Sequence, residues 1–248
     1  MAKTRSLTSD NITYDLEDSV TPSGKTAARS HLRDYLSANL RPPSVKELAV
    51  RINAVSTPEA LADLTALANV PNLDAIVIPK VNSPSDLTFV SDVLRHASSS
   101  SLSPSSRQQH QRKDNPIKLI ALIESARAVT DLRSICSTKA PDLHLDGLIF
   151  AAEDFALDLS LTRTPSLTEF LYARSAIVTA ARAYDLPSAI DLVCTSYKGE
   201  EGIARLREEC LSGKGLGFNG KRKFYFPFPA ICSPTTPPPF SPVFHLVF

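Results

Sequence analysis

Three carboxylates directly follow two apolar, β-branched runs of the chain, where they could bind a metal ion or exchange protons. The run IKLIALIES contains Glu124 at its end, and the run LDGLIFAAEDF ends at Glu153 and Asp154. Between the runs, residues 126–136 carry apolar side chains at roughly helical spacing, so the stretch from Ile117 onward predicts a strand–helix–strand unit of about 30 residues. Parallel strands joined in this way end at the same edge of a sheet, and we expect the acids to face one another there.

The rest of the chain alternates in the same way between short apolar runs and amphipathic stretches. Six strands alternating with helices imply a parallel sheet covered by helices, either a closed barrel or an open doubly wound sheet. No GxGxxG or GxxxxGK[ST] pattern follows any of the strands, so the dinucleotide-binding and P-loop folds lose their main support. We therefore predict a TIM (β/α)8-type barrel. Besides the unit above, the expected strands are 11–15, 47–52, 73–79 and 189–195, and the expected helices include 24–40, one that begins at Thr57-Pro58, 166–184 and 200–212.

The composition changes at two places along the chain. Residues 97–114 are low in complexity and are expected to form a mobile surface insertion. Residues 222–248 hold seven of the 19 prolines and six of the 11 phenylalanines and show neither strand nor helix periodicity. The predicted organisation is one barrel domain, 1–221, followed by an irregular Pro- and Phe-rich tail, 222–248.

The charge and cysteine content narrow the classes of function. With 27 basic and 26 acidic side chains, the net charge is +1, which gives no electrostatic case for binding nucleic acid or an anionic membrane. The four cysteines form no CxxC pair, so reduced thiols and an intracellular location are expected. No targeting segment is visible, and the location could be mitochondrial or cytoplasmic.

Further polar residues follow the other predicted strands and would gather at the same edge. In α/β barrels the active site lies at the carboxyl-terminal ends of the strands. Any one of these residues could be an ordinary polar loop residue, whereas the whole set together favours a site. The set comprises Asp15, Glu17, Asp18, Arg51, Asn53, Lys80, Glu124, Ser125, Glu153, Asp154 and Ser196.

Several motifs together resemble a known family. Residues 5–221 contain, in order, YDLEDSV followed by Lys25 and Ala28-Arg29, then VRIN, IVIPKV, LIESA, FAAEDFALDL and GLGFNGK. This order resembles the citrate lyase beta-subunit-like proteins of the HpcH/HpaI aldolase and malyl-CoA lyase group. The resemblance implies a TIM barrel, a divalent metal that is usually Mg²⁺, and cleavage or formation of a carbon–carbon bond in a CoA thioester or 2-oxo acid.

Carried over by position, the resemblance assigns the metal to Glu124 and Asp154. This agrees with the preference of Mg²⁺ for one or two carboxylates together with water and substrate oxygens. Glu153 would hydrogen-bond backbone groups or orient a water on the metal. Arg51 resembles the arginine that binds the substrate carboxylate, for which a planar fork is suited, although it could instead pair with the DLED acids one strand away.

The resemblance is less specific for four further charged residues. The resemblance places the acids Glu17 and Asp18 near the metal, where they would either contact it through water or have catalytic, proton-handling roles. Lys25 and Arg29 are candidates for contacts to CoA phosphates, and equally for ordinary solvated charges. Lys80 is expected to be an ion-pair partner in the barrel mouth rather than a Schiff-base lysine.

The implied activity is that of a magnesium-dependent carbon–carbon lyase. It would act on a 3-hydroxyacyl-CoA of the citramalyl-CoA or malyl-CoA type and give acetyl-CoA and a 2-oxo acid. One alternative is a non-catalytic or regulatory relative that keeps the metal site. Another is a 2-oxo acid aldolase that does not use CoA. Such an enzyme would usually require a histidine base near the DLED motif, and His31 is the nearest histidine to that motif. The resemblance also implies a homo-oligomer, commonly a trimer.

Two strands of the family pattern are not recognisable in the sequence. Proteins of this group have a strand before the DLED strand, and after GFNGK a last strand ending in an IHP-type motif. We therefore expect a barrel without its first and last strands, with two exposed sheet edges and a tail whose prolines cannot donate to a strand ladder. Such a polypeptide is expected to be poorly stable and weakly active or inactive.

Overall fold

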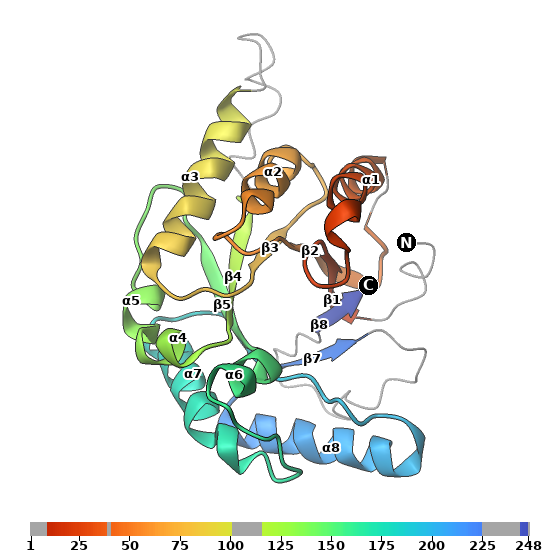
Figure 1. Cartoon of the computed structure of the whole chain (residues 1–248), viewed down its shortest axis with the longest axis vertical. Coiled ribbons are helices and arrows are strands. Elements are labelled where there is room, and N and C mark those ends of the chain that lie inside the picture. The colour runs from red at the N-terminus through yellow and green to blue at the C-terminus, as the bar shows by residue number, and fades with distance from the viewer. Residues whose placement is uncertain (1–8, 39–40, 101–115, 225–243, 248) are drawn as a thin grey trace.

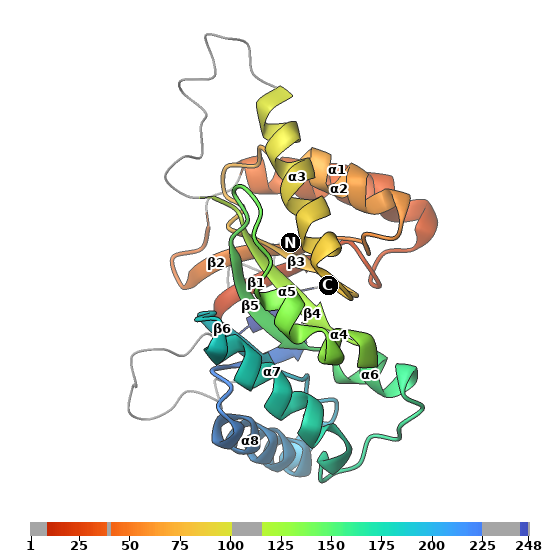
Figure 2. The ribbon, with the colours of Figure 1, turned by 90° about the vertical axis from the view of Figure 1, so that its left-hand side faces the viewer.

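Strands and helices alternate along the chain, and the strands form one parallel sheet that closes on itself. The computed structural model describes residues 9–38, 41–100, 116–224 and 244–247. Every strand pairing is parallel, and the order runs from β1 to β8 and back to β1. Figures 1 and 2 show the helices arranged around the outside of this sheet. The predicted α/β class and curled parallel sheet are confirmed.

The elements have the following bounds. The strands are β1 (Ser9–Asp15), β2 (Val45–Arg51), β3 (Ala75–Ile78), β4 (Lys118–Ile123), β5 (Leu145–Phe150), β6 (Ser188–Asp191), β7 (Gly220–Phe224) and β8 (Phe244–Val247). The α-helices are α1 (Lys25–Ala38), α2 (Pro58–Leu67), α3 (Pro84–Ser100), α4 (Ala126–Thr130), α5 (Leu132–Cys136), α6 (Ala152–Asp158), α7 (Leu171–Ala183) and α8 (Gly199–Leu216). Two 3₁₀ helices, η2 (Pro22–Gly24) and η3 (Thr168–Phe170), precede α1 and α7.

The strands bury both faces, because alternate side chains enter two separate apolar clusters. On β4, Ile120 and Leu122 belong to a small cluster inside the barrel, whereas Leu119 and Ala121 belong to the large cluster that also includes helix residues. The inner cluster consists of Ala49, Ala75, Val77, Ile120, Leu122, Ile149, Ala151 and Ile190. Polar residues that face inward at the carboxyl-terminal ends of the strands, past this cluster, therefore lie at the mouth of the barrel.

The last two strands, β7 and β8, differ from the expectation that residues 222–248 form an irregular tail. β7 extends to Phe224, and β8 falls within 222–248, which the sequence analysis treats as irregular. β8 pairs with β1 through Asn11–Tyr14 and with β7 through Arg222–Phe224, so both of the edges expected to be exposed are paired (Figure 1). The physical reason lies in the sequence of β8. It is FHLV, which is mostly apolar and follows the last proline of the chain, Pro242, so nothing prevents its backbone from donating to a ladder.

Two helical segments also differ from the sequence expectation. α3 continues to Ser100, so the first four residues of the predicted insertion 97–114 are helical, and the remainder lies outside the described residues. The single helix expected over 126–136 is divided at Asp131, where φ is −103° and ψ is 12°. Among the described helices, none combines the length and apolarity that a membrane span requires.

Candidate functional site

The carboxyl-terminal ends of β1 to β5 bring together most of the charged residues that the sequence singles out. Arg51 is the last residue of β2, Lys80 follows β3, and Glu124 follows β4 directly. Asp154 lies in the first turn of α6, directly after β5. The acids that were expected to face one another are thus carried to one mouth of the barrel.

Arg51 and Asp15 form a buried bidentate pair that links β1 to β2. The Nε and Nη2 atoms of Arg51 donate to the two carboxylate oxygens of Asp15 at 2.7 and 2.6 Å. Asp15 also accepts hydrogen bonds from the backbone N–H groups of Glu17 (2.9 Å) and Ser19 (3.1 Å). Burial alone would raise the pKa of Asp15, but the hydrogen bonds and charge of Arg51 outweigh it and lower that pKa. The alternative partner considered for Arg51, an acid of the DLED segment, is therefore confirmed.

Glu17 lies between two cations, whereas Asp18 faces the solvent. Lys80 Nζ donates to Glu17 Oε1 at 2.5 Å, which confirms the ion-pair role expected of this lysine. Arg51 Nη1 lies 2.8 Å from Glu17 Oε2, close enough for an ion pair but without the angle of a hydrogen bond. Burial raises the pKa of Glu17 in spite of both cations. The side chain of Asp18 is 63% exposed and reaches Arg51 Nη1 at 3.3 Å.

Glu124 is a buried carboxylate whose oxygens make no hydrogen bond of good geometry with the residues that the structure describes. The residue is 4% exposed. Burial raises the pKa of Glu124 to about 7, with added contributions from the charges of Asp154 and Glu17, which the charge and the nearby backbone N–H of Lys80 partly oppose. A buried carboxyl group of this kind requires an explanation, and a bound cation would provide one.

The donor set at this position fits Mg²⁺. No group of three or more histidine, cysteine, aspartate and glutamate side chains placed to hold a metal occurs within 9–38, 41–100, 116–224 and 244–247. Two carboxylates, Glu124 and the half-buried Asp154, are the number of protein ligands that Mg²⁺ typically takes, since it keeps several waters and binds substrate oxygens.

Glu153, the neighbour of Asp154, belongs to an extended charge network that the sequence analysis did not find. It forms an ion pair with Arg163, whose Nη2 also donates to Glu209 on α8 at 3.0 Å. Lys221 Nζ on β7 then reaches Glu209 at 3.1 Å and Asp191 on β6 at 3.3 Å. The partners are separated by 10 to 46 positions, so no local pattern could have indicated the network.

A second buried ion pair anchors α7 and α8 to β6. Arg174 on α7 donates to both carboxylate oxygens of Asp191 at 3.0 and 2.8 Å, and its guanidinium carbon lies 5.9 Å from the centre of the Phe218 ring. Gly213 on α8 packs directly against this pair, because a Cβ atom there would lie 2.5 Å from Asp191 Oδ2.

The two residues predicted to contact CoA phosphates have protein partners. Lys25 Nζ donates to the carbonyl oxygens of Leu16 (2.8 Å) and Glu17 (2.6 Å), and so holds the DLED turn. Arg29 is 9% exposed and joins α1 to α2 through Asp63, at 2.7 Å from its Nε, and through Glu59. These contacts are structural, and a role in binding CoA stays a prediction.

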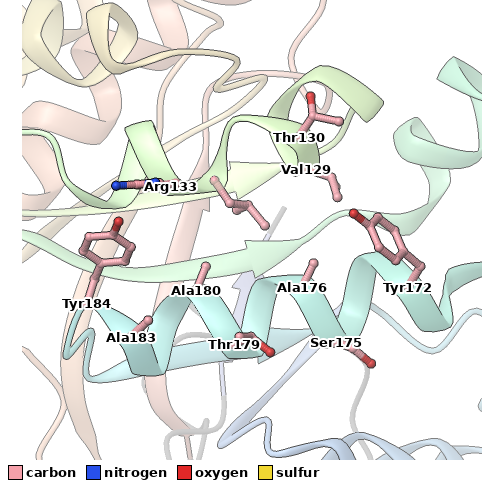
Figure 3. A pocket seen from close by; sticks show the side chains of 11 residues that line it. Val129, Thr130, Arg133, Tyr172, Ser175, Ala176, Thr179, Ala180, Ala183 and Tyr184 are labelled. Carbon is pink, nitrogen blue, oxygen red and sulfur yellow. The ribbon is translucent and has the colours of Figure 1, made fainter.

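A groove on the outer helical layer is separate from this mouth. It has a volume of about 470 Å³ and lies between α4, α5 and α7, with Tyr172 and Tyr184 at its two ends (Figure 3). Its floor and walls consist mainly of small and apolar side chains, including Val129, Ala176 and Ala180. The charged residues at the mouth do not line it.

Comparison with known proteins identifies one family, whose solved structures share the fold described above. A family profile described as HpcH/HpaI aldolase/citrate lyase matches residues 1–224. The mitochondrial citramalyl-CoA lyase of Rattus norvegicus is 31% identical over 227 residues, which are 89% of this chain and 62% of that protein. Citrate lyase subunit beta of Leuconostoc mesenteroides subsp. cremoris is 33% identical over 212 residues, 86% of this chain and 64% of that protein. This chain thus spans less than two thirds of the length of either relative.

Among solved structures, a citrate lyase beta subunit from M. tuberculosis, complexed with oxaloacetate and magnesium, matches with a TM-score of 0.64. The match covers 90% of this chain and 94% of that one at 22% identity, which shows a shared fold.

Proposed function

The chain belongs to the HpcH/HpaI aldolase/citrate lyase family, and we propose that it is a magnesium-dependent carbon–carbon lyase. Its substrate would be a 3-hydroxyacyl-CoA of the citramalyl-CoA or malyl-CoA type, and its products acetyl-CoA and a 2-oxo acid. The relatives named citramalyl-CoA lyase and citrate lyase subunit beta support the reaction class.

One observation carries this proposal: Glu124 is buried at the barrel mouth beside a second carboxylate, and neither of its carboxylate oxygens makes a hydrogen bond of good geometry with a described residue. A stable fold has no need of such a group, because an unpaired buried charge destabilises the protein. Together with Asp154 it would hold Mg²⁺. When bound there, the ion would supply positive charge that stabilises negative charge on the oxygens of the substrate.

The other residues of the mouth would orient the substrate and move protons. During cleavage the 3-hydroxyl group loses its proton as the bond between the carbinol carbon and the thioester α-carbon breaks. The bonding electrons pass to the thioester, whose α-carbon then takes up a proton and gives acetyl-CoA. We assign the proton transfers to Glu17 and Asp18 and the orientation of the substrate carboxylate to Arg51, whose guanidinium Asp15 holds in place.

Two further expectations belong to this proposal. A homo-oligomer, in particular a trimer, follows from the resemblance to the family. A mitochondrial or cytoplasmic location is consistent with the free thiols of Cys136 and Cys194 and with the mitochondrial relatives.

The test is the magnesium-dependent release of acetyl-CoA from citramalyl-CoA and malyl-CoA. We expect release with at least one substrate, and its loss with EDTA and in Glu124→Ala and Asp154→Ala. Glu169→Ala is the control, because Glu169 lies outside the mouth and its carboxylate accepts hydrogen bonds from Thr164 rather than from a residue of the mouth. Full activity of both carboxylate variants, or no release from either substrate, would refute the proposal.

A further inference from the structure

The side chain of Arg222 on β7 enters the interior of the barrel. Ile190 of the inner cluster pairs with Gly220, and Asp191 pairs with Lys221. Lys221 shares the outer face of the sheet with Asp191 and contacts Glu209 on α8. Successive residues of a strand point to opposite faces, so Arg222 shares the inner face with Ile190.

Arg222 is buried there without full hydrogen bonding. The residue is 6% exposed, and its Nε–H has no partner among the residues that the structure describes. Glu124, also inward-facing, has two carboxylate oxygens in the same condition. Among the described residues, the buried Nε–H of Arg222 and the two buried oxygens of Glu124 are therefore not bonded to each other, and a ligand held between them would satisfy both.

The charges around Arg222 belong to the candidate site. Burial, and after it the charge of Arg51, lower the pKa of Arg222 to about 10, while Glu124 and Asp15 act in the opposite direction. At neutral pH the guanidinium is therefore charged, and its electrostatic neighbours are the residues of the barrel mouth.

Arg51, the other guanidinium at the mouth, has less capacity for a ligand. Its Nε and Nη2 donate to Asp15, and its Nη1 faces Glu17 and Asp18. Each of its three nitrogens thus already faces a protein carboxylate. The buried Nε–H of Arg222 makes no such contact with any described residue, and a guanidinium is well suited to bind a carboxylate through two parallel hydrogen bonds.

We propose that Arg222 binds the carboxylate of the 2-oxo acid, and the same carboxylate in the hydroxyacyl-CoA from which it is released, as a second guanidinium beside Arg51. This rests on the proposed function, since it takes the substrate class from it. Arg222 is then a specificity residue: it favours 3-hydroxyacyl-CoA thioesters that carry a carboxylate on the carbinol carbon over those that carry only hydrogen or alkyl groups there.

The experiment is a calorimetric titration of pyruvate into the full-length protein at saturating MgCl₂. Arg222→Met removes the charge, Arg222→Lys keeps the charge without the fork, and Arg207→Met makes the same change at an exposed position on α8. We expect pyruvate to bind roughly tenfold to a hundredfold more weakly to Arg222→Met, since a hydrogen bond to a charged group is lost. Arg222→Lys should be intermediate and Arg207→Met unchanged.

Two further readouts separate this inference from the metal assignment. Methyl pyruvate, which lacks the carboxylate, should bind the wild type and Arg222→Met equally weakly. The Mg²⁺ affinity of Arg222→Met should equal or exceed that of the wild type, because a cation near Glu124 has been removed. If the wild type binds no Mg²⁺ and its pyruvate binding still depends on Arg222, the proposed function fails and the role of Arg222 stands.

Pyruvate binding equal to the wild type in Arg222→Lys and Arg222→Met would overturn the role of Arg222, as would the absence of pyruvate binding to the wild type. If Arg222→Met does not fold, two other measurements test the role of Arg222: the pyruvate affinity of Arg222→Lys, and the preference of the wild type for pyruvate over methyl pyruvate.

Discussion

Replacement of Glu124 by glutamine should stabilise the metal-free protein while removing its response to Mg²⁺. Most substitutions of a buried charged residue destabilise a protein, because they leave a partner unpaired. Glu124 has no hydrogen bond of good geometry to lose in the described part of the chain, and an amide oxygen could still accept from the backbone N–H of Lys80. Its ionised form is disfavoured by burial and by the charges of Asp154 and Glu17. The neutral amide removes that cost.

The magnitude follows from the pKa. Glu124 has a pKa of about 7 in the folded protein, against 4.5 for the ordinary group, so the folded state holds the proton more tightly than the unfolded chain. The unfolded chain therefore releases the proton first, and the folded state loses stability relative to it as the pH rises from about 4.5 to about 7. Above pH 7 the accumulated cost is constant. A difference of about 2.5 pH units corresponds to roughly 3 kcal/mol, and this is the gain expected for Glu124→Gln at pH 8.

The assay is urea unfolding in EDTA, for both proteins, at pH 8 and at pH 5. The advantage of the variant should be about 3 kcal/mol at pH 8 and should shrink toward pH 5. Addition of MgCl₂ at pH 8 should stabilise the wild type alone.

Glu209→Gln is the matched control. Glu209 is about as buried as Glu124 but is paired with Lys221 and Arg163. The same chemical change should therefore destabilise the protein there by roughly 3 kcal/mol, because it leaves buried cations uncompensated. A metal-free Glu124→Gln protein that is less stable than the wild type at pH 8 would refute the reasoning.

Three other substitutions test the packing of α8 and the buried ion pair of Arg29. Gly213→Ala should destabilise the protein by roughly 1–3 kcal/mol, because the new Cβ atom would meet Asp191. Gly215→Ala, where a Cβ atom would have nothing within 4 Å, should stabilise the protein by up to about 1 kcal/mol. Urea unfolding of both variants measures these changes, and equal effects would contradict the packing argument. Arg29→Met should lower the unfolding free energy by roughly 3 kcal/mol, because it breaks the buried pair with Asp63. Its KM for the acyl-CoA, measured where the variant is folded, should stay within about twofold of the wild type if the residue is structural, and a KM raised tenfold or more would support the predicted contact to CoA phosphate.

The regular part of the fold is predictable from the sequence because it depends on local pattern. The apolar runs before Glu124 and Glu153 become β4 and β5, and the acids arrive at the same mouth because parallel strands share a direction. The ends of the sheet are not predictable in this way. β8 is a four-residue strand beyond a proline-rich segment, and its pairing with β1 joins residues more than 200 positions apart. No periodicity can indicate such a contact.

The same limit applies to the partners of the charged residues. The sequence indicates, as one of two alternatives, that Arg51 pairs with acids of the DLED segment one strand away, and it indicates an ion pair for Lys80 in the barrel mouth without naming the acid. It does not indicate that Lys25 holds backbone carbonyls or that Arg222 faces the interior, because these depend on side-chain direction at a turn and on the register of β7. The metal assignment of Glu124 and Asp154 stays a prediction, which the unpartnered oxygens of Glu124 support.

The central claim is that Glu124 and Asp154 hold one divalent cation at the barrel mouth. The most direct measurement is a calorimetric titration of Mg²⁺ into the metal-free wild type, Glu124→Ala, Asp154→Ala and the control Glu169→Ala at pH 8. One ion should bind to the wild type and to the control, and its binding should be lost or weakened at least tenfold in each of the other two variants. Equal Mg²⁺ affinity in all four proteins would contradict the account.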